Sequence, residues 1–317
     1  MVRRHASGPR TAFNRLAAVL LSVGLGGCQW GADRPPQLPG LRGQERPLVL
    51  TTFSVLADMA RAVAGDRLRV ESITKIGAEI HGYEPTPSDI KRSTGAVLIL
   101  ENGLELERWV RRFTDNMPGV PHVTLTDGIT PLPIAEDAYR GRANPHAWMS
   151  PRLAERYVEN IRSAFTRLDP AGAAEYRRNA ETYRAQLRRL DLELRASLAR
   201  IPSRRRVLAT CEGAFSYLAR DYGLQEAYLW PVNAESQVTP QRMARLVDLV
   251  RKRGVPAVFC ETTVSDKAQR QVAEESGSRF GGAFFVDSLS LPGGAAPTLL
   301  RLQRHNARLL VDGLKGE

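Results

Sequence analysis

Short apolar runs alternate with amphipathic segments along most of the chain. The run at residues 96–101, AVLILE, is typical: its first five successive positions are apolar, which predicts a strand that is buried on both faces. The predicted strands are Pro47–Phe53, Arg67–Thr74, Ala96–Glu101, His122–Thr126, Arg206–Cys211, Glu226–Trp230, Ala257–Glu261 and Ala283–Val286. This rhythm predicts an α/β fold with two lobes, residues 47–168 and 203–317, each a parallel four-stranded sheet flanked by helices.

The longest helical pattern lies between these two lobes. Asp169 and Pro170 supply an N-cap and a first-turn proline, and the pattern ends near Pro202. One apolar stripe follows helical spacing along it: Tyr176, Ala180, Tyr183, Leu187, Leu190 and Leu194. Residues 169–202 therefore predict one rigid helix, roughly 45 Å long, that joins the lobes. The other predicted helices are Val55–Ala64, Pro87–Thr94, Glu105–Asn116, Ala214–Tyr222, Pro240–Lys252, Asp266–Ser276 and Thr298–Asp312.

The N-terminus is organised like an export signal. Four arginines and no acidic residue precede the apolar stretch Leu16–Leu25, which is too short to span a bilayer. The stretch ends in LGGC, which resembles a lipobox. It predicts removal of a signal peptide, residues 1–27, and lipidation of Cys28; an ordinary signal peptide with an incidental cysteine is the alternative. Residues 28–46 are rich in proline and glycine and predict a tether, which places the protein in the periplasm or on the outer face of the cytoplasmic membrane.

Charge and composition narrow the class of partner. Hydrophobic residues make up 43% of the 317 residues and charged residues 25%, values that exclude general disorder. The net charge of +11 raises nucleic acid as a partner. However, four of these positive charges belong to the predicted signal peptide. The basic runs at 204–206 and 251–253 lack interleaved aromatic residues, so nucleic acid is a poor candidate.

Four residues with metal-ligand chemistry lie at the predicted binding edges of the sheets. His81 is in the loop after the second predicted strand, and His146 is in a loop that closes the first lobe. Glu212 and Asp287 each directly follow a predicted strand of the second lobe. Ligands of open α/β sheets bind at the carboxyl ends of strands, so each lobe offers two candidate ligands. Taken singly, a loop histidine is more often structural, and a carboxylate in the position of Glu212 can cap the next helix.

As a set, two imidazoles and two carboxylates suit a divalent cation. The carboxylates carry a charge of −2, which neutralises the ion and offsets the penalty of burying it. Mixed oxygen and nitrogen ligation suits Mn²⁺ better than a thiolate site would, although Zn²⁺ binds most such sites more tightly and is a possible competitor.

Four motifs carry a resemblance to a known family: HGYEPTPSD (81–89), NPHAWMSP (144–151), CEGAFSYLARDYGL (211–224) and FFVDSL (284–289). They resemble the metal-binding lipoproteins of manganese and zinc ABC importers. The resemblance implies two lobes, joined by a rigid helix, that hold one ion and deliver it to a membrane permease and its ATPase. It places the ligands at His81, His146, Glu212 and Asp287. We expect a monomer that is attached to the membrane through its lipid.

The resemblance also bears on the metal. Zinc members tend to have a histidine-rich loop and a histidine where this chain has Glu212, whereas this chain has five histidines in all. Both features favour manganese, and iron remains possible. Cys211 and Cys260 lie at two predicted strand ends, as in the cyanobacterial manganese-binding members. They predict a disulfide next to the metal site in an oxidising compartment, with two buried free thiols as the alternative.

Other functional classes remain open at this point. A secreted metallohydrolase could use the same four residues, but a catalytic metal keeps an open position for water or substrate. Two imidazoles and two potentially bidentate carboxylates leave no clear vacancy, so we expect a binding protein and not an enzyme. A surface adhesin is compatible with the fold but has no distinct sequence mark.

Overall fold

The computed structural model describes residues 46–115, 117–136, 139–232 and 238–316. The predicted signal peptide, the lipidation site Cys28 and nearly all of the tether lie outside these described residues. Among the described residues, no helix combines the length and apolar character needed to cross a membrane.

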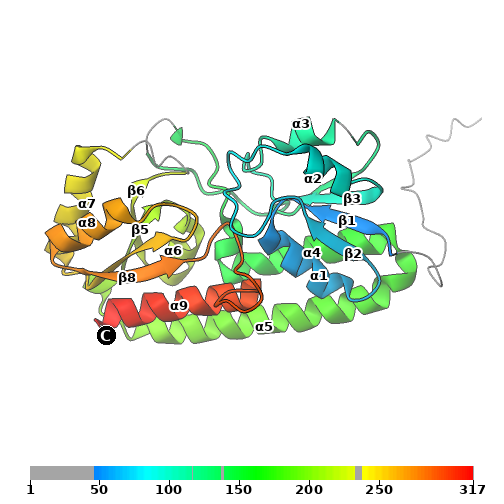
Figure 1. Ribbon diagram of the computed structural model, residues 1–317. Helices are drawn as coiled ribbons and strands as arrows, with labels where there is room; N and C mark the ends of the chain where they lie inside the picture. Colours follow the sequence, from blue (N-terminus) through cyan, green and yellow to red (C-terminus); the bar gives the residue numbers. More distant parts are fainter. Residues whose placement is uncertain (1–45, 116, 137–138, 233–237, 317) are drawn as a thin grey trace, which may run out of the picture. The chain divides into compact units, whose positions relative to one another are not determined.

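The first lobe contains one parallel four-stranded sheet, as predicted (Figure 1). Its order is β2-β1-β3-β4, so β1 and β3 are the central strands. Val49 of β1 is in register with Val70 on one side and Leu98 on the other. The strands are β1 (Leu48–Thr51), β2 (Arg69–Ser72), β3 (Ala96–Glu101) and β4 (His122–Thr124).

Helices cover both faces of this sheet because successive strand residues point to opposite sides. Val49 packs into the main core with α1 (Ser54–Ala64) and α4 (Pro151–Leu168). Leu48 and Leu50 pack into a smaller cluster with α2 (Pro87–Arg92) and α3 (Val110–Thr114). The predicted helix over 105–116 is wrong at its start. Leu104 and Glu105 have φ values of 54° and 60°, which a right-handed helix cannot contain.

The second lobe departs from the prediction of a single four-stranded sheet. Its strands form two parallel pairs, β5–β6 and β7–β8, and β5 lies beside β7 without a strand ladder between them. The Cys211–Cys260 disulfide joins this pair of strands, with their Cα atoms 4.8 Å apart. The side chain of Glu261 accepts the backbone N–H of Glu212, which a strand neighbour would otherwise bind. The strands are β5 (Val207–Glu212), β6 (Gln225–Trp230), β7 (Ala257–Glu261) and β8 (Arg279–Phe284).

The position of β8 is a second correction. The apolar run predicts a strand over 283–286, but β8 ends at Phe284 and includes Gly281, a residue type that disfavours strands. Gly281 is needed here because a Cβ atom on it would lie 2.4 Å from Cε1 of Phe259. Asp287 therefore lies in the segment beyond β8 and does not directly follow it.

A long helix runs between the lobes, as predicted. It consists of a 3-10 turn (Pro170–Gly172) followed by α5 (Ala173–Ala199), and the predicted apolar stripe is its buried face. α5 contacts α1 and α4 in the first lobe and α6 and α9 in the second (Figure 1). α4 has no counterpart among the predicted elements, although its buried positions follow the same spacing. The remaining helices are α6 (Ser216–Tyr222), α7 (Pro240–Arg253), α8 (Lys267–Ser276) and α9 (Leu299–Lys315).

The two lobes share one hydrophobic core. Buried residues form a continuous cluster from β1 and α1 through α4 and α5 to β5, β7 and α9. Phe53 of the first lobe packs on Trp148, with ring centroids 5.0 Å apart, and Phe259 stacks on Phe284 in the second lobe. A shared core opposes wide separation of the lobes, since apolar surface would then be exposed to water.

Loss of the disulfide should destabilise the fold. The bond closes a loop with a sequence separation of 49, which corresponds to about 4 kcal/mol on the chain-entropy model. We expect the Cys211→Ala/Cys260→Ala variant to unfold at a lower urea concentration than the oxidised wild type. Reduced wild-type protein is the matched control and should unfold near the variant. Two free thiols in the unfolded, unreduced wild type would contradict the disulfide.

Candidate metal centre

The structure brings the four predicted ligands together from four separate segments. His81 lies in the loop after β2, and His146 precedes a short 3-10 turn (Ala147–Met149). Glu212 is the last residue of β5, and Asp287 follows β8. The Nε2 atoms of His81 and His146 are 3.2 Å apart. Oε1 of Glu212 is 3.5 Å from Nε2 of His81 and 3.6 Å from Nε2 of His146.

Asp287 completes the cluster and lacks a hydrogen-bond partner for one oxygen. Its Oδ1 lies 4.0 Å from Nε2 of His146. This oxygen is buried and accepts no hydrogen bond from any residue that the structure describes. A buried carboxylate oxygen without a donor is unfavourable, and a cation placed among these ligands would compensate it.

Burial sets the protonation of the cluster. It lowers the pKa of His81 to about 3 and the pKa of His146 well below its usual value, the latter with a contribution from the charge of His81. Both imidazoles are therefore neutral near pH 7 and keep a lone pair for a metal. Burial, with a contribution from the charge of Glu79, raises the pKa of Asp287 to about 8. The side chain of His81 is 11% exposed, whereas that of Glu212 is only 1% exposed, so His81 is the more accessible ligand.

Asn144 fixes which nitrogen of His146 faces the other ligands. Its Nδ2 donates to the carbonyl oxygen of Gly213 at 2.7 Å, and a carbonyl can only accept. Oδ1 of Asn144 therefore faces His146, where it accepts the backbone N–H at 3.0 Å and lies 3.0 Å from Nδ1. Nδ1 must carry the ring proton, which leaves Nε2 with its lone pair toward the cluster.

The segment Asn144–Trp148, which we call the crossing loop, contacts both ligand segments of the second lobe. Asn144 binds Gly213, the residue after Glu212. At the other end, the indole N–H of Trp148 donates to the carbonyl oxygen of Val286 at 3.2 Å, next to Asp287. The crossing loop thereby fixes the spacing between ligands of different lobes.

Hydrogen bonds within the first lobe hold the crossing loop and the His81 loop. Asn102, just beyond β3, donates to the carbonyl oxygen of Pro145 at 3.0 Å and accepts the hydroxyl of Tyr157 at 2.6 Å. In the His81 loop, the carboxylate of Glu79 accepts the backbone N–H groups of His81 and Gly82.

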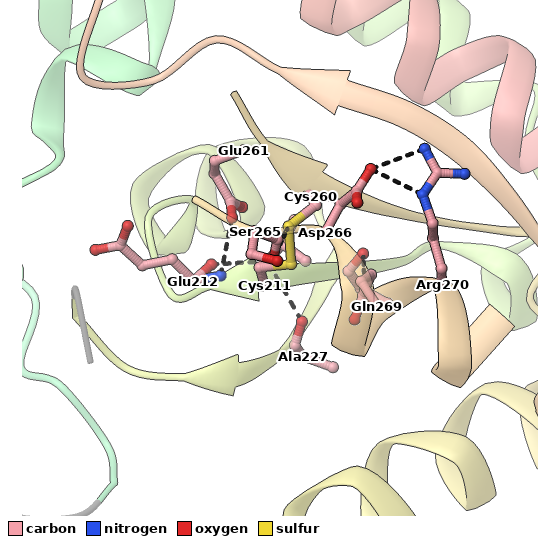
Figure 2. The surroundings of a disulfide bond; sticks show 11 residues. Cys211, Glu212, Ala227, Cys260, Glu261, Ser265, Asp266, Gln269 and Arg270 are labelled. Carbon is pink, nitrogen blue, oxygen red and sulfur yellow. Dashed lines mark hydrogen bonds and ion pairs between the residues drawn. A yellow bond between two sulfur atoms is a disulfide. The ribbon is translucent and has the colours of Figure 1, made fainter. Parts of the chain in front are cut away.

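A second buried carboxylate supports Glu212 from behind. Oε2 of Glu261 accepts the backbone N–H of Glu212 at 3.1 Å, and burial raises the pKa of Glu261 well above its usual value. Figure 2 shows Glu261 and the disulfide on one side of the Glu212 backbone, with the Glu212 carboxylate directed away from them. The residue types alone gave Glu261 no role, because its contact with Glu212 depends on how β5 and β7 pack.

Sequence reasoning also missed the positioning roles of Asn144 and Trp148. Both flank His146 within NPHAW, a motif in which polar and aromatic side chains surround a ligand. That motif was the available signal, since an outer hydrogen-bond partner of a ligating histidine is a general feature of metal sites.

Comparison with known proteins identifies the family. Residues 49–313 match the family described as zinc-uptake complex component A, periplasmic (ZnuA). The chain belongs to the ZnuA family. Iron-binding protein YfeA of Yersinia pestis is 52% identical over 265 residues, which cover 84% of this chain and 85% of YfeA. The manganese-binding lipoprotein MntA of Halalkalibacterium halodurans is 33% identical over 303 residues, which cover 96% of this chain and 97% of MntA.

A solved structure supports the same assignment. The Mn-bound periplasmic metal binding protein from candidatus Liberibacter asiaticus is 37% identical, with a TM-score of 0.79. The match covers 85% of this ZnuA-family chain and 100% of that one. The chain is therefore a metal-binding, substrate-binding component of an ABC importer. The ZnuA family consists of transport components, which confirms the prediction of a binding protein and not an enzyme.

The bond from Trp148 to Val286 should contribute to both stability and metal affinity. The Trp148→Phe variant keeps a ring but leaves the buried carbonyl of Val286 without its donor. We expect a loss of about 1–3 kcal/mol in the free energy of unfolding, together with weaker metal binding. Urea unfolding and metal titration measure the two effects.

The Tyr222→Phe variant is the control for this experiment. It removes the hydrogen bond from Tyr222 to Asp191, which lies away from the ligands. It should lower stability and leave metal affinity unchanged. Equal metal affinity in the two variants would contradict the positioning role of Trp148.

Proposed function

We propose that the protein captures Mn²⁺ outside the cytoplasm on His81, His146, Glu212 and Asp287 and delivers it to an ABC permease. The observation that supports this most directly is the convergence of two neutral imidazoles and two carboxyl groups on His146, whose Nε2 lies 3.2 Å from His81, 3.6 Å from Glu212 and 4.0 Å from Asp287. The unpaired Oδ1 of Asp287 adds an acceptor that a cation would satisfy. Metal binding without an open coordination position suits capture and transport.

The donor set favours Mn²⁺ among the divalent ions of the family. Carboxylate oxygens suit Mn²⁺, and the site contains no thiolate, because Cys211 and Cys260 are joined to each other. A relative and a solved structure whose names specify manganese support this choice. Fe²⁺ is the second candidate cargo, supported by the 52% identity to an iron-binding protein. Zn²⁺ is a competitor at any site of this kind.

The working location follows from the same proposal. A lipid on Cys28 would hold the domain at the outer face of the cytoplasmic membrane, and residues 28–46 would let it reach the permease. We infer that the permease acts with an ATPase and that the protein works as a monomer. The names of several relatives include the word lipoprotein, which supports the anchor.

Removal of a ligand should weaken Mn²⁺ binding without unfolding the protein. We expect His81→Ala and Glu212→Ala each to lower affinity by about tenfold or more, the lower limit seen for outer-sphere partners. His122→Ala is the matched control, because His122 opens β4 and pairs with Glu101 away from the site. Calorimetric titration measures all three variants. Wild-type affinity in either ligand variant would refute the assignment of that residue.

Metal identity has its own test. Elemental analysis of protein purified from cells supplied with Mn²⁺, Fe²⁺ and Zn²⁺ should find manganese, and competition in vitro should show that Zn²⁺ displaces it. Binding of Fe²⁺ or Zn²⁺ with no measurable binding of Mn²⁺ would overturn the choice of manganese. The assignment of the four ligands would survive that result.

A further inference from the structure

A chain of buried and partly buried hydrogen bonds leads from His146 into the second lobe. Nδ1 of His146 is 3.0 Å from Oδ1 of Asn144, and Nδ2 of Asn144 is 3.1 Å from Oγ of Ser216. Oγ of Ser216 is 2.5 Å from Oε2 of Glu226. The chain thus starts at a ligand of the first lobe, passes through the start of α6 and ends at a carboxylate on β6.

The direction of every bond in this chain is determined. The amide nitrogen of Asn144 can only donate, so Ser216 accepts from it and uses its own proton to donate to Glu226. The other oxygen of Glu226 accepts the backbone N–H of Phe215 at 3.0 Å, which holds the carboxylate in place. All donors therefore point from His146 toward Glu226. Hydrogen bonds that are aligned in this way within one chain polarise and strengthen one another.

We propose that Asn144, held from the second lobe by Ser216 and Glu226, makes the metal-binding form of His146 depend on contact between the lobes. The inference rests on the proposed function, since it assumes that His146 is a ligand. Metal-bound histidines commonly donate their other ring N–H directly to a carboxylate. Here the carboxylate belongs to the opposite lobe and acts through two intermediate side chains.

The arrangement links release of the ion to a small movement. If the second lobe moved away from the crossing loop, Asn144 would lose its bonds to Gly213 and Ser216 together. Together with the backbone N–H of His146, which donates to Oδ1, those bonds fix the orientation of the Asn144 amide, and with it the proton on Nδ1 of His146. His146 could then exchange tautomers, and its Nε2 would no longer be held as a free lone pair toward the ion.

Substitution of Ser216 tests the relay. Ser216→Ala removes the link and should lower Mn²⁺ affinity by up to about tenfold, the lower end of the range for outer-sphere partners, because Ser216 acts on His146 only through Asn144. Ser150→Ala is the matched control, because the buried Ser150 also donates to a carboxylate, Asp221, at 2.6 Å. It should bind Mn²⁺ as the wild type does. An equal loss in the two variants, or none in Ser216→Ala, would overturn the proposal.

A second variant and a second readout separate the relay from general destabilisation. Glu226→Gln keeps the shape of the side chain but removes the charge and can make only one of the two accepting contacts. Like Ser216→Ala, this variant should bind Mn²⁺ more weakly than the wild type does. In the metal-free wild type, ¹⁵N chemical shifts of the His146 ring should show a proton on Nδ1 alone. In Ser216→Ala, where Asn144 keeps its bond to Gly213 but loses the one to Ser216, a measurable fraction of the Nε2–H tautomer should appear.

The two hypotheses fail differently in this experiment. A single Nδ1–H tautomer in both proteins would overturn the relay even if affinity fell. A wild-type protein that binds no divalent metal would refute the proposed function, whatever tautomer His146 adopts.

Discussion

Two hydrogen bonds from the crossing loop to the second lobe fix the geometry of the metal centre. One runs from Asn144 to Gly213 and the other from Trp148 to Val286. Each ends at the residue next to a candidate ligand, so a shift of Glu212 or Asp287 would strain a directional hydrogen bond. Metal–ligand distances vary by only a few tenths of an ångström around preferred values, so a site divided between lobes needs such a constraint.

The same two bonds bring together groups that resist burial. Glu212 and Asp287 are both buried carboxyl groups, burial raises the pKa of Asp287 to about 8, and Oδ1 of Asp287 accepts no hydrogen bond from the described residues. Glu261 and the disulfide hold the backbone of β5 at Glu212, and the carboxylate of Glu212 is directed away from them (Figure 2). The fold thus maintains an arrangement that a divalent cation stabilises, which is the electrostatic basis of tight capture.

The convergence of the four candidate ligands was predictable from the sequence because each lies in a short motif that follows a predicted strand or closes a lobe. His146 is within NPHAW and Glu212 ends an uninterrupted buried strand, so local pattern and position agree. Asp287 lies near His146 as expected even though its strand was misplaced, because an error of a few residues left it at the same edge of the lobe.

Tertiary contacts were not predictable in the same way. The separation of the second sheet into two pairs depends on the approach of β5 to β7, and the role of Ser216 depends on residues 144 and 226 meeting it from different segments. Strand pairing at long sequence separation carries no local signal. Gly281 also makes β8 hard to recognise, because glycine disfavours strands, yet the close approach of Phe259 leaves no room for a larger residue there. By contrast, the helical spacing of apolar residues over Pro151–Leu168 is visible in the sequence and is enough to predict α4.

The shared core determines how such a protein can open. Trp148 and Phe53 are fully buried, and wide separation of the lobes would expose aromatic surface at about 25 cal/mol per Å². The two bonds that Asn144 makes to the second lobe contribute only about 1 kcal/mol each in net terms. On the proposed function, a permease that pulled on the second lobe would break the hydrogen bonds of Asn144 before it disrupted the core. Release through a local change at His146 would then require less free energy than a hinge motion, and a rigid helix such as α5 is compatible with it.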